Sequence, residues 1–411
     1  MAERPRALLL RAAVLVALCI AIGQASTYLL NLVAARALGP ASFGELASLL
    51  GILAIGNVVA LGVQAATARR IVTSPPSDHR GTAAAALRAS FPAGLAVAAA
   101  TALTYPITSS LLHLGGPADL LLVAVSLIPL TVVGAQLGVA QGSEAPGRLA
   151  LVYLGGAVKS AGGIAGAVLG GTVTSTLVGV AIGSVAMAVA LQLVVHPLAD
   201  AAPLHQERWA SEVLHASHAL AALFVLTTAD LLLARHFLPA VQSGVYAAGS
   251  IVAKIAFWLP QAVIVLAFPG MADHRRRRAL VVGGVGVAAL GAALVLATEL
   301  LPDLVVLVVG GAAYSELASF VWMFALLGAL QSLAQFLLYS RLAVEDRRAV
   351  GALWAAVVAV VALVWVGPHS TPVDIVRSAV VVTALLCVAG GALAVAEIRR
   401  DVPEDAAVET A

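Results

Sequence analysis

Long apolar runs separated by short polar breaks follow one another along the whole chain. We recognise twelve, at 10–36, 44–68, 87–112, 118–142, 148–170, 173–195, 209–238, 243–268, 279–301, 314–342, 349–366 and 376–397. A membrane-spanning helix needs about 20 apolar residues and makes all of its backbone hydrogen bonds internally. The pattern therefore predicts an all-α integral membrane protein with about 12 transmembrane helices.

The composition excludes several other classes of protein. Charged residues make up 11% of the chain, whereas soluble globular domains carry about 25%. A soluble enzyme, a disordered chain, a coiled coil and a nucleic-acid binder are all ruled out by this balance. The sequence also lacks a phosphate-binding loop, a catalytic triad and any metal-ligand spacing. We therefore expect no enzymatic activity, no cofactor, no metal and no nucleic-acid partner.

The arginines are distributed unevenly between the two sides of this predicted topology. With the N-terminus placed inside, 18 of the 21 arginines fall in the inner gaps, and only Arg36, Arg235 and Arg377 fall outside. Positive charge is retained on the cytoplasmic side of membrane proteins. The distribution predicts a multi-pass protein of a bacterial inner membrane with both termini in the cytoplasm.

The longest inner break separates the sixth run from the seventh and divides the chain into two halves. We predict an N-terminal six-helix bundle at 1–196, a cytoplasmic linker at 197–208, a C-terminal six-helix bundle at 209–398 and a polar cytoplasmic tail at 399–411.

The two halves share a spaced pattern of residues. A polar residue, an arginine and a proline end the first run and recur at the end of the seventh. They are Asn31, Arg36 and Pro40 in the first half and Asp230, Arg235 and Pro239 in the second. The same offset of 199 residues carries Gln136 onto Gln335. Because each half holds an even number of spans, the halves form a parallel repeat, an arrangement in which transporters bind substrate between the halves.

A family resemblance rests on the segment 33–47, which contains Arg36, Gly39-Pro40 and Phe43-Gly44-Glu45, and on the later segments 62–64 and 68–70. These residues resemble the start of bacterial polysaccharide biosynthesis proteins. Those proteins are oligosaccharide flippases of the multidrug/oligosaccharidyl-lipid/polysaccharide exporter superfamily. The resemblance implies a V-shaped pair of pseudo-symmetric six-helix bundles that moves polyprenyl-diphosphate-linked glycans across the membrane by alternating access.

The chain contains two lysines, and both fall near the middle of predicted spans. Lys159 lies roughly 16 Å into its helix at 1.5 Å per residue. It shares a face with four glycines, which is typical of a helix-packing surface; these are Gly155, Gly162, Gly166 and Gly170. Lys254 shares the polar face of its own helix with Gln261. Ionisable groups at membrane depth are costly and mark functional candidates. We predict that both lysines line a transport cavity and hold an anionic headgroup; the alternative is a structural role.

Other polar residues complete the candidate site. Asn31, Arg36, Asp230 and Arg235 fall toward the outer ends of their helices and form either a structural ion-pair cluster or a gate or ion-coupling site. Gln331 and Gln335 lie one turn apart, and with Gln261 they are expected to line the cavity. The amides suit bonds to sugar hydroxyls or to each other across helices, and the sequence does not separate these roles.

The combined interpretation is a transporter that flips or exports a lipid-linked oligosaccharide or polysaccharide intermediate. Its expected partners are membrane lipid, a polyprenyl-diphosphate-linked glycan, and glycosyltransferases or a polymerase. A multidrug/cation antiporter of the same superfamily is one alternative, although its cavity would need an acidic centre. A non-transporting membrane component of a glycan-assembly complex is another.

Overall fold

The computed structural model describes residues 3–204, 208–261, 263–264, 276–342 and 348–400, and the described part contains helices without any strand. Arg275, Arg347 and residues 401–411 of the predicted tail lie outside this part. The elements are α1 (Glu3–Gly56), α2 (Val58–Thr73), η1 (Pro76–Asp78), α3 (His79–Leu103), α4 (Tyr105–Leu112), α5 (Ala118–Gly142), α6 (Pro146–Gly170), α7 (Val173–Val195), η2 (His196–Leu198), α8 (Trp209–Phe237), α9 (Ala240–Trp258), α11 (Arg276–Leu300), α12 (Pro302–Val309), η3 (Gly311–Ser319), α13 (Val321–Leu342), α14 (Arg348–Val366) and α15 (Pro372–Arg400).

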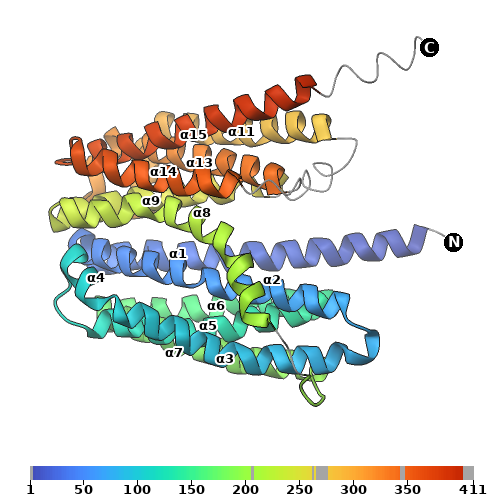
Figure 1. Cartoon of the computed structure of the whole chain (residues 1–411). Coiled ribbons are helices and arrows are strands. Elements are labelled where there is room, and N and C mark those ends of the chain that lie inside the picture. Colours follow the sequence, from blue (N-terminus) through green and yellow to red (C-terminus); the bar gives the residue numbers. More distant parts are fainter. Residues whose placement is uncertain (1–2, 205–207, 262, 265–275, 343–347, 401–411) are drawn as a thin grey trace, which may run out of the picture. The chain divides into compact units, whose positions relative to one another are not determined.

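Eleven stretches of the described residues are long and apolar enough to cross a membrane. The first, Val14–Thr73, has 60 residues and would be about 90 Å long as one helix, three times the thickness of a hydrocarbon core. It is interrupted at Gly39, whose φ of 71° and ψ of 171° lie outside the helical region and suit glycine. In Figure 1 the chain turns back after the dark blue part of α1 and returns through α2. Divided there, the stretches give twelve crossings, so the predicted fold class is confirmed.

Several helix boundaries differ from the sequence prediction. The expected run 87–112 is divided between α3 and α4, because Pro106 has no N–H with which to continue the helix. The expected start of a helix at 314 is replaced by η3, and α13 begins only at Val321. The expected run 44–68 comprises the end of α1, up to Gly56, and then α2, which continues to Thr73.

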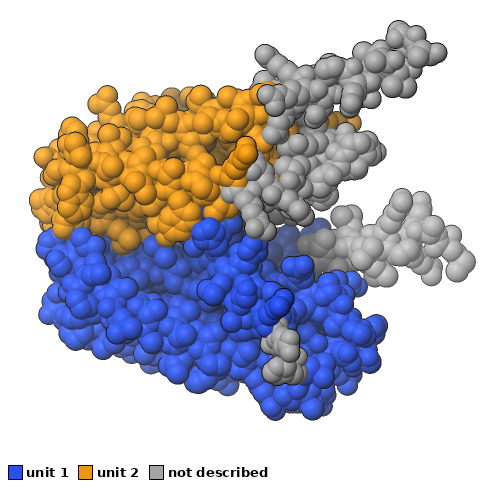
Figure 2. Space-filling view, in the orientation of Figure 1, with its two compact units in different colours: residues 1–224 blue, residues 225–411 orange. Residues whose placement is uncertain are grey.

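The first compact unit comprises residues 1–224 and is shown in blue in Figure 2. Its tightest helix contact joins α6 and α7. A Cβ on Gly162 would meet the Gly179 carbonyl oxygen, and a Cβ on Gly179 would meet that of Gly162. Small residues allow this approach of two backbones, which van der Waals contact stabilises within a membrane.

The second unit comprises residues 225–411, so the division falls inside α8. The start of α8 packs within the first unit, where Trp209 and Val213 join a cluster with Val63, Ala66 and Ala135. Arg70 at the end of α2 also donates to both carboxylate oxygens of Glu212, at 2.8 and 3.0 Å. The predicted linker at 197–208 rests on the longest inner break between apolar runs. The division at 224 rests on the packing of the helices. The sequence-based domain boundaries stay a prediction.

The packing within each unit reveals the internal repeat. In the first unit, residues of α5 pack on residues of α2 that precede them by 74 positions. Gly134 packs on Ala60, and Gly142 packs on Ala68. In the second unit α9 and α13 pair at nearly the same separation, 75 residues between Ala253 and Gly328.

The antiparallel pairs agree as well. Gly94 of α3 faces Ile128 of α5, and Gly291 of α11 faces Ala329 of α13. Shifting the first pair by 199 residues gives 293 and 327, which differ from the second pair by two residues in opposite directions. In an antiparallel pair, each step forward along one helix is matched by a step back along the other. The two contacts therefore belong to the same register. The short helices α4 and α12 also follow the corresponding long helices α3 and α11. The two units therefore contain the same arrangement of helices, in the same order along the chain.

We expect Gly162→Ala to lower stability by about 1–3 kcal/mol, because the added methyl overpacks the contact with Gly179. Gly156→Ala in the same helix is the matched control, since the nearest atom to its added Cβ, the Gly23 Cα, lies 3.9 Å away. Thermal unfolding of the purified protein in detergent measures both. Equal unfolding temperatures for the two variants would contradict this account of the contact.

The predicted topology is tested by single cysteines at two exposed serines, Ser77 between α2 and α3 and Ser370 between α14 and α15. The native Cys19 and Cys387 are first replaced by alanine. An impermeant thiol reagent applied to intact cells should label Ser370→Cys and should label Ser77→Cys only after the cells are opened. Labelling of both positions from the same side would refute twelve alternating spans.

Candidate functional site

Lys159 lies in the glycine-lined contact between α6 and α7. A Cβ on Gly183 of α7 would lie 2.9 Å from both the Cα and the carbonyl oxygen of Lys159. Gly155 and Gly162 on the same face of α6 pack against Leu191 and Gly179. The predicted packing face of α6 is therefore confirmed. The lysine side chain is half-buried on this face, within the first unit.

Asp230 is the centre of a buried polar cluster in the second unit. Its side chain in α8 is 4% exposed, and the Tyr246 hydroxyl of α9 donates to its Oδ2 at 2.6 Å. Tyr246 is fully buried and packs edge-to-face on Phe324, with ring centroids 4.9 Å apart. Lys254 lies two turns after Tyr246 on α9, and its side chain is half-buried. A charge that is taken out of water needs hydrogen-bond partners, and the Tyr246 hydroxyl is one for Asp230.

Arg235 lies five residues after Asp230 and is also buried, and its Nη1 donates to the Ser243 hydroxyl at 3.4 Å. The equivalent residues of the first half are placed differently. Asn31 donates to the Thr27 carbonyl of its own helix at 2.8 Å, and the Arg36 side chain is exposed. The two copies of the repeated motif therefore have different environments. A gate or ion-coupling role for these four residues remains a prediction.

The three glutamines of the predicted cavity lie on α13 and just after α9. The Gln261 amide donates to the Gln335 side-chain oxygen across the two helices, and Gln335 donates in turn to the Tyr339 hydroxyl at 3.3 Å. Gln331 lies one turn before Gln335 and is 4% exposed. The sequence leaves two roles open for Gln335, and in the structure it accepts a hydrogen bond across helices. Lining of a cavity by the three residues remains a prediction.

The first unit has its own glutamine contacts. Gln136, the counterpart of Gln335, is fully buried and donates to the Ala188 carbonyl at 2.8 Å and to Gln192 at 3.2 Å. Gln64 of α2 donates to Gln141 at 3.0 Å. Interhelical hydrogen bonds of this kind hold membrane helices together.

Tyr246 was not among the predicted site residues. Its signal lay in the repeat itself, because an offset of 200 aligns Tyr246 with Leu46 in the first half. Both side chains are fully buried. A hydroxyl-bearing residue in place of a leucine indicates a buried polar partner, which the structure identifies as Asp230.

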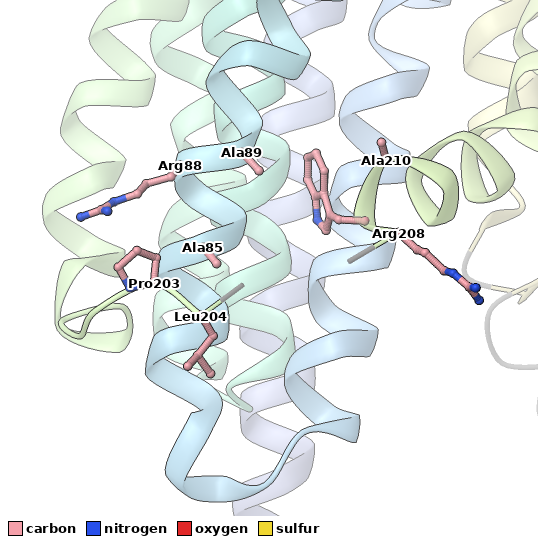
Figure 3. A pocket seen from close by; sticks show the side chains of 8 residues that line it. Ala85, Arg88, Ala89, Pro203, Leu204, Arg208 and Ala210 are labelled. Atoms are coloured by element: carbon pink, nitrogen blue, oxygen red, sulfur yellow. The ribbon is translucent and has the colours of Figure 1, made fainter. Parts of the chain in front are cut away.

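Each unit contains a cavity lined by residues that the structure describes. The first has a volume of about 700 Å³ and is lined by residues of α3, of the segment before α8 and of the start of α8. In Figure 3 its two charged residues, Arg88 and Arg208, point away from each other, so they do not converge on a common ligand. The second cavity, of about 330 Å³, lies between α13, α14 and α15. The described residues contain no cluster of three metal-ligating side chains.

Comparison with solved structures identifies the fold. An inward-facing multidrug resistance MATE family transporter of the MOP superfamily superposes with a TM-score of 0.69 at 11% identity, covering 93% of this chain and 96% of that chain. The lipid II flippase MurJ, in an inward closed conformation, also gives 0.69, at 10% identity over 91% and 86%. A MOP superfamily transporter from Pyrococcus furiosus gives 0.61, at 14% identity over 92% and 94%.

No family model and no curated protein matches the sequence. Since the identities of the solved structures lie between 10% and 14%, the likeness concerns the fold. The chain has the fold of these MOP superfamily membrane proteins.

The Asp230 cluster can be tested by a double-mutant cycle. Tyr246→Phe should lower the free energy of unfolding by about 1–3 kcal/mol, because Asp230 Oδ2 loses its donor while it stays buried. In an Asp230→Asn background the same substitution should cost less, since the buried charge is gone. Denaturation of the detergent-solubilised protein gives the four values. Additive effects would contradict coupling between the two side chains.

Proposed function

We propose that this protein is a membrane transporter that flips or exports a lipid-linked oligosaccharide or polysaccharide intermediate by alternating access. The observation that carries the proposal is the state of Asp230. It is the only buried carboxylate among the described residues, Tyr246 donates to it, and Lys254 follows Tyr246 by two turns on α9. In this proposal the positive charge of Lys254 disfavours a cationic ligand beside this carboxylate.

The basic residues favour an anionic cargo. Lys159 adds positive charge to the first unit, and a diphosphate entering a low-dielectric site needs compensating cations. In this proposal Lys159 and Lys254 face one transport cavity and hold the diphosphate. Gln261, Gln331 and Gln335 offer amides to sugar hydroxyls, and Asn31, Arg36, Asp230 and Arg235 form the gate near the outer exit.

The fold is compatible with this role, since one of the similar structures is named as a flippase of lipid II. The proposed setting is a bacterial inner membrane with both termini in the cytoplasm, as the arginine distribution predicts. The proposed partners are membrane lipid, a polyprenyl-diphosphate-linked glycan and the glycosyltransferases or polymerase that make or extend it. We infer no enzymatic activity.

A multidrug/cation antiporter is the second candidate, because another similar structure is named as a multidrug resistance transporter. The two functions make opposite demands on charge. A cationic drug would be repelled by two lysines in one cavity, whereas an anionic headgroup would be attracted.

The proposal is tested in proteoliposomes with a fluorescent polyprenyl-diphosphate oligosaccharide as the probe. The wild-type chain should move the probe between leaflets. The Lys159→Gln, Lys254→Gln double variant should lose at least tenfold in rate, because the headgroup loses both compensating charges. Arg377→Gln, which removes an exposed charge at the start of α15, is the matched control and should transport normally.

Ethidium efflux from cells separates the second candidate from the first. Efflux by the wild-type chain, with no movement of the lipid-linked probe, would replace the flippase proposal with the antiporter. Full transport of the lipid-linked probe by the double lysine variant would end the assigned role of the lysines.

A further inference from the structure

The second unit contains an apolar crevice, and the charged residues in its described lining are two arginines. Its volume is about 330 Å³. The lining of α13, α14 and α15 is aliphatic apart from Arg341 and Arg348, with Leu337, Leu353 and Leu393 as its larger members. No residue of the proposed transport site lines it.

The two arginines lie at one end of the crevice. Arg341 is the penultimate residue of α13 and Arg348 is the first residue of α14, so the connection between these helices brings both to the same side of the membrane. At the other end, Ala334 and Leu386 offer only hydrocarbon. The described lining is therefore polarised, with two arginines at one end and only apolar side chains at the other.

The depth of the crevice matches one leaflet. Along α15 the lining extends from Leu386 to Ala396, which is about 15 Å at 1.5 Å per residue. The hydrocarbon core of a bilayer is about 30 Å thick, so one leaflet contributes about half of that depth. An occupant that follows the crevice would end near the middle of the membrane.

At the corresponding positions the first half of the repeat is filled by packed side chains. There, Leu149 and Leu191 belong to a packed core around Val139 and Val152. An offset of 199 places Arg348 at the position of Leu149 and Gly390 at that of Leu191; an offset of 200 would place Gly391 there. The second half has thus exchanged two filling leucines for a charge and a glycine.

We propose that this crevice binds an anionic phospholipid of the bilayer, with one acyl chain between α13, α14 and α15 and the phosphate at Arg341 and Arg348. An acyl chain is the apolar molecule that a membrane supplies at this depth. Basic pockets between transmembrane helices bind anionic headgroups, and arginine pairs well with phosphate. The lipid is a resident of the second unit, so this inference does not depend on the cargo of the transporter.

The test is native mass spectrometry of the full-length protein in detergent, titrated with dioleoyl phosphatidylglycerol or dioleoyl phosphatidylcholine. The wild-type chain should retain phosphatidylglycerol at least fivefold better. Gly390→Leu should abolish retention of one lipid molecule, because the new side chain enters the crevice beside Leu337. Gly391→Leu is the matched control, since nothing lies within 4 Å of its added Cβ. If Gly390→Leu fails to fold, Ala352→Leu fills the crevice from the exposed side of α14.

The charge is tested separately. The Arg341→Gln, Arg348→Gln double variant should lose the preference for phosphatidylglycerol while the Arg377→Gln control keeps it. Unchanged retention in the crevice-filling variants would overturn the proposal. Retention of a polyprenyl phosphate in preference to excess phosphatidylglycerol would also overturn it, because the crevice would then belong to the cargo.

Discussion

Within the hydrocarbon core of a bilayer there is no water to satisfy an exposed peptide group, and the rest of this structure depends on that constraint. Each span must complete its own backbone hydrogen bonds, so the chain folds as helices from α1 to α15. Stability must then come from close packing between helices that are apolar on all sides. The contact of Gly162 with Gly179 shows how this is achieved, because the absence of a Cβ lets two backbones meet.

The same arrangement of helices is used twice, and the differences between the copies are informative. The register of α2 on α5 recurs within one residue as the register of α9 on α13. Upon this shared frame Leu46 is replaced by Tyr246, which binds Asp230. A packed leucine in the first half is replaced by glycine beside the arginine-capped crevice of the second. At these positions the second unit has a polar contact and a crevice, whereas the first unit has packed leucines.

The charges within the helices differ between the units in a related way. Lys159 lies on a glycine-lined contact, whereas in the second unit Tyr246 donates to a buried carboxylate. An uncompensated charge at this depth is costly, so the hydrogen bond from Tyr246 reduces the cost of keeping Asp230 there. Lys159 and Lys254 are cations within the helices, which is why the proposed cargo is an anion.

The sequence by itself determined the class of fold, the twelve crossings, the repeat and the packing face of α6. Each follows from local periodicity or from spacing along one helix, which the bilayer constrains strongly. Only the tertiary structure decided that Asp230 meets Tyr246, that Gln335 meets Gln261 and that a crevice opens beside Gly390. These contacts depend on how two or three helices are rotated and aligned against one another. Hydropathy cannot report that alignment, because in a membrane helix the faces toward lipid and toward protein are both apolar.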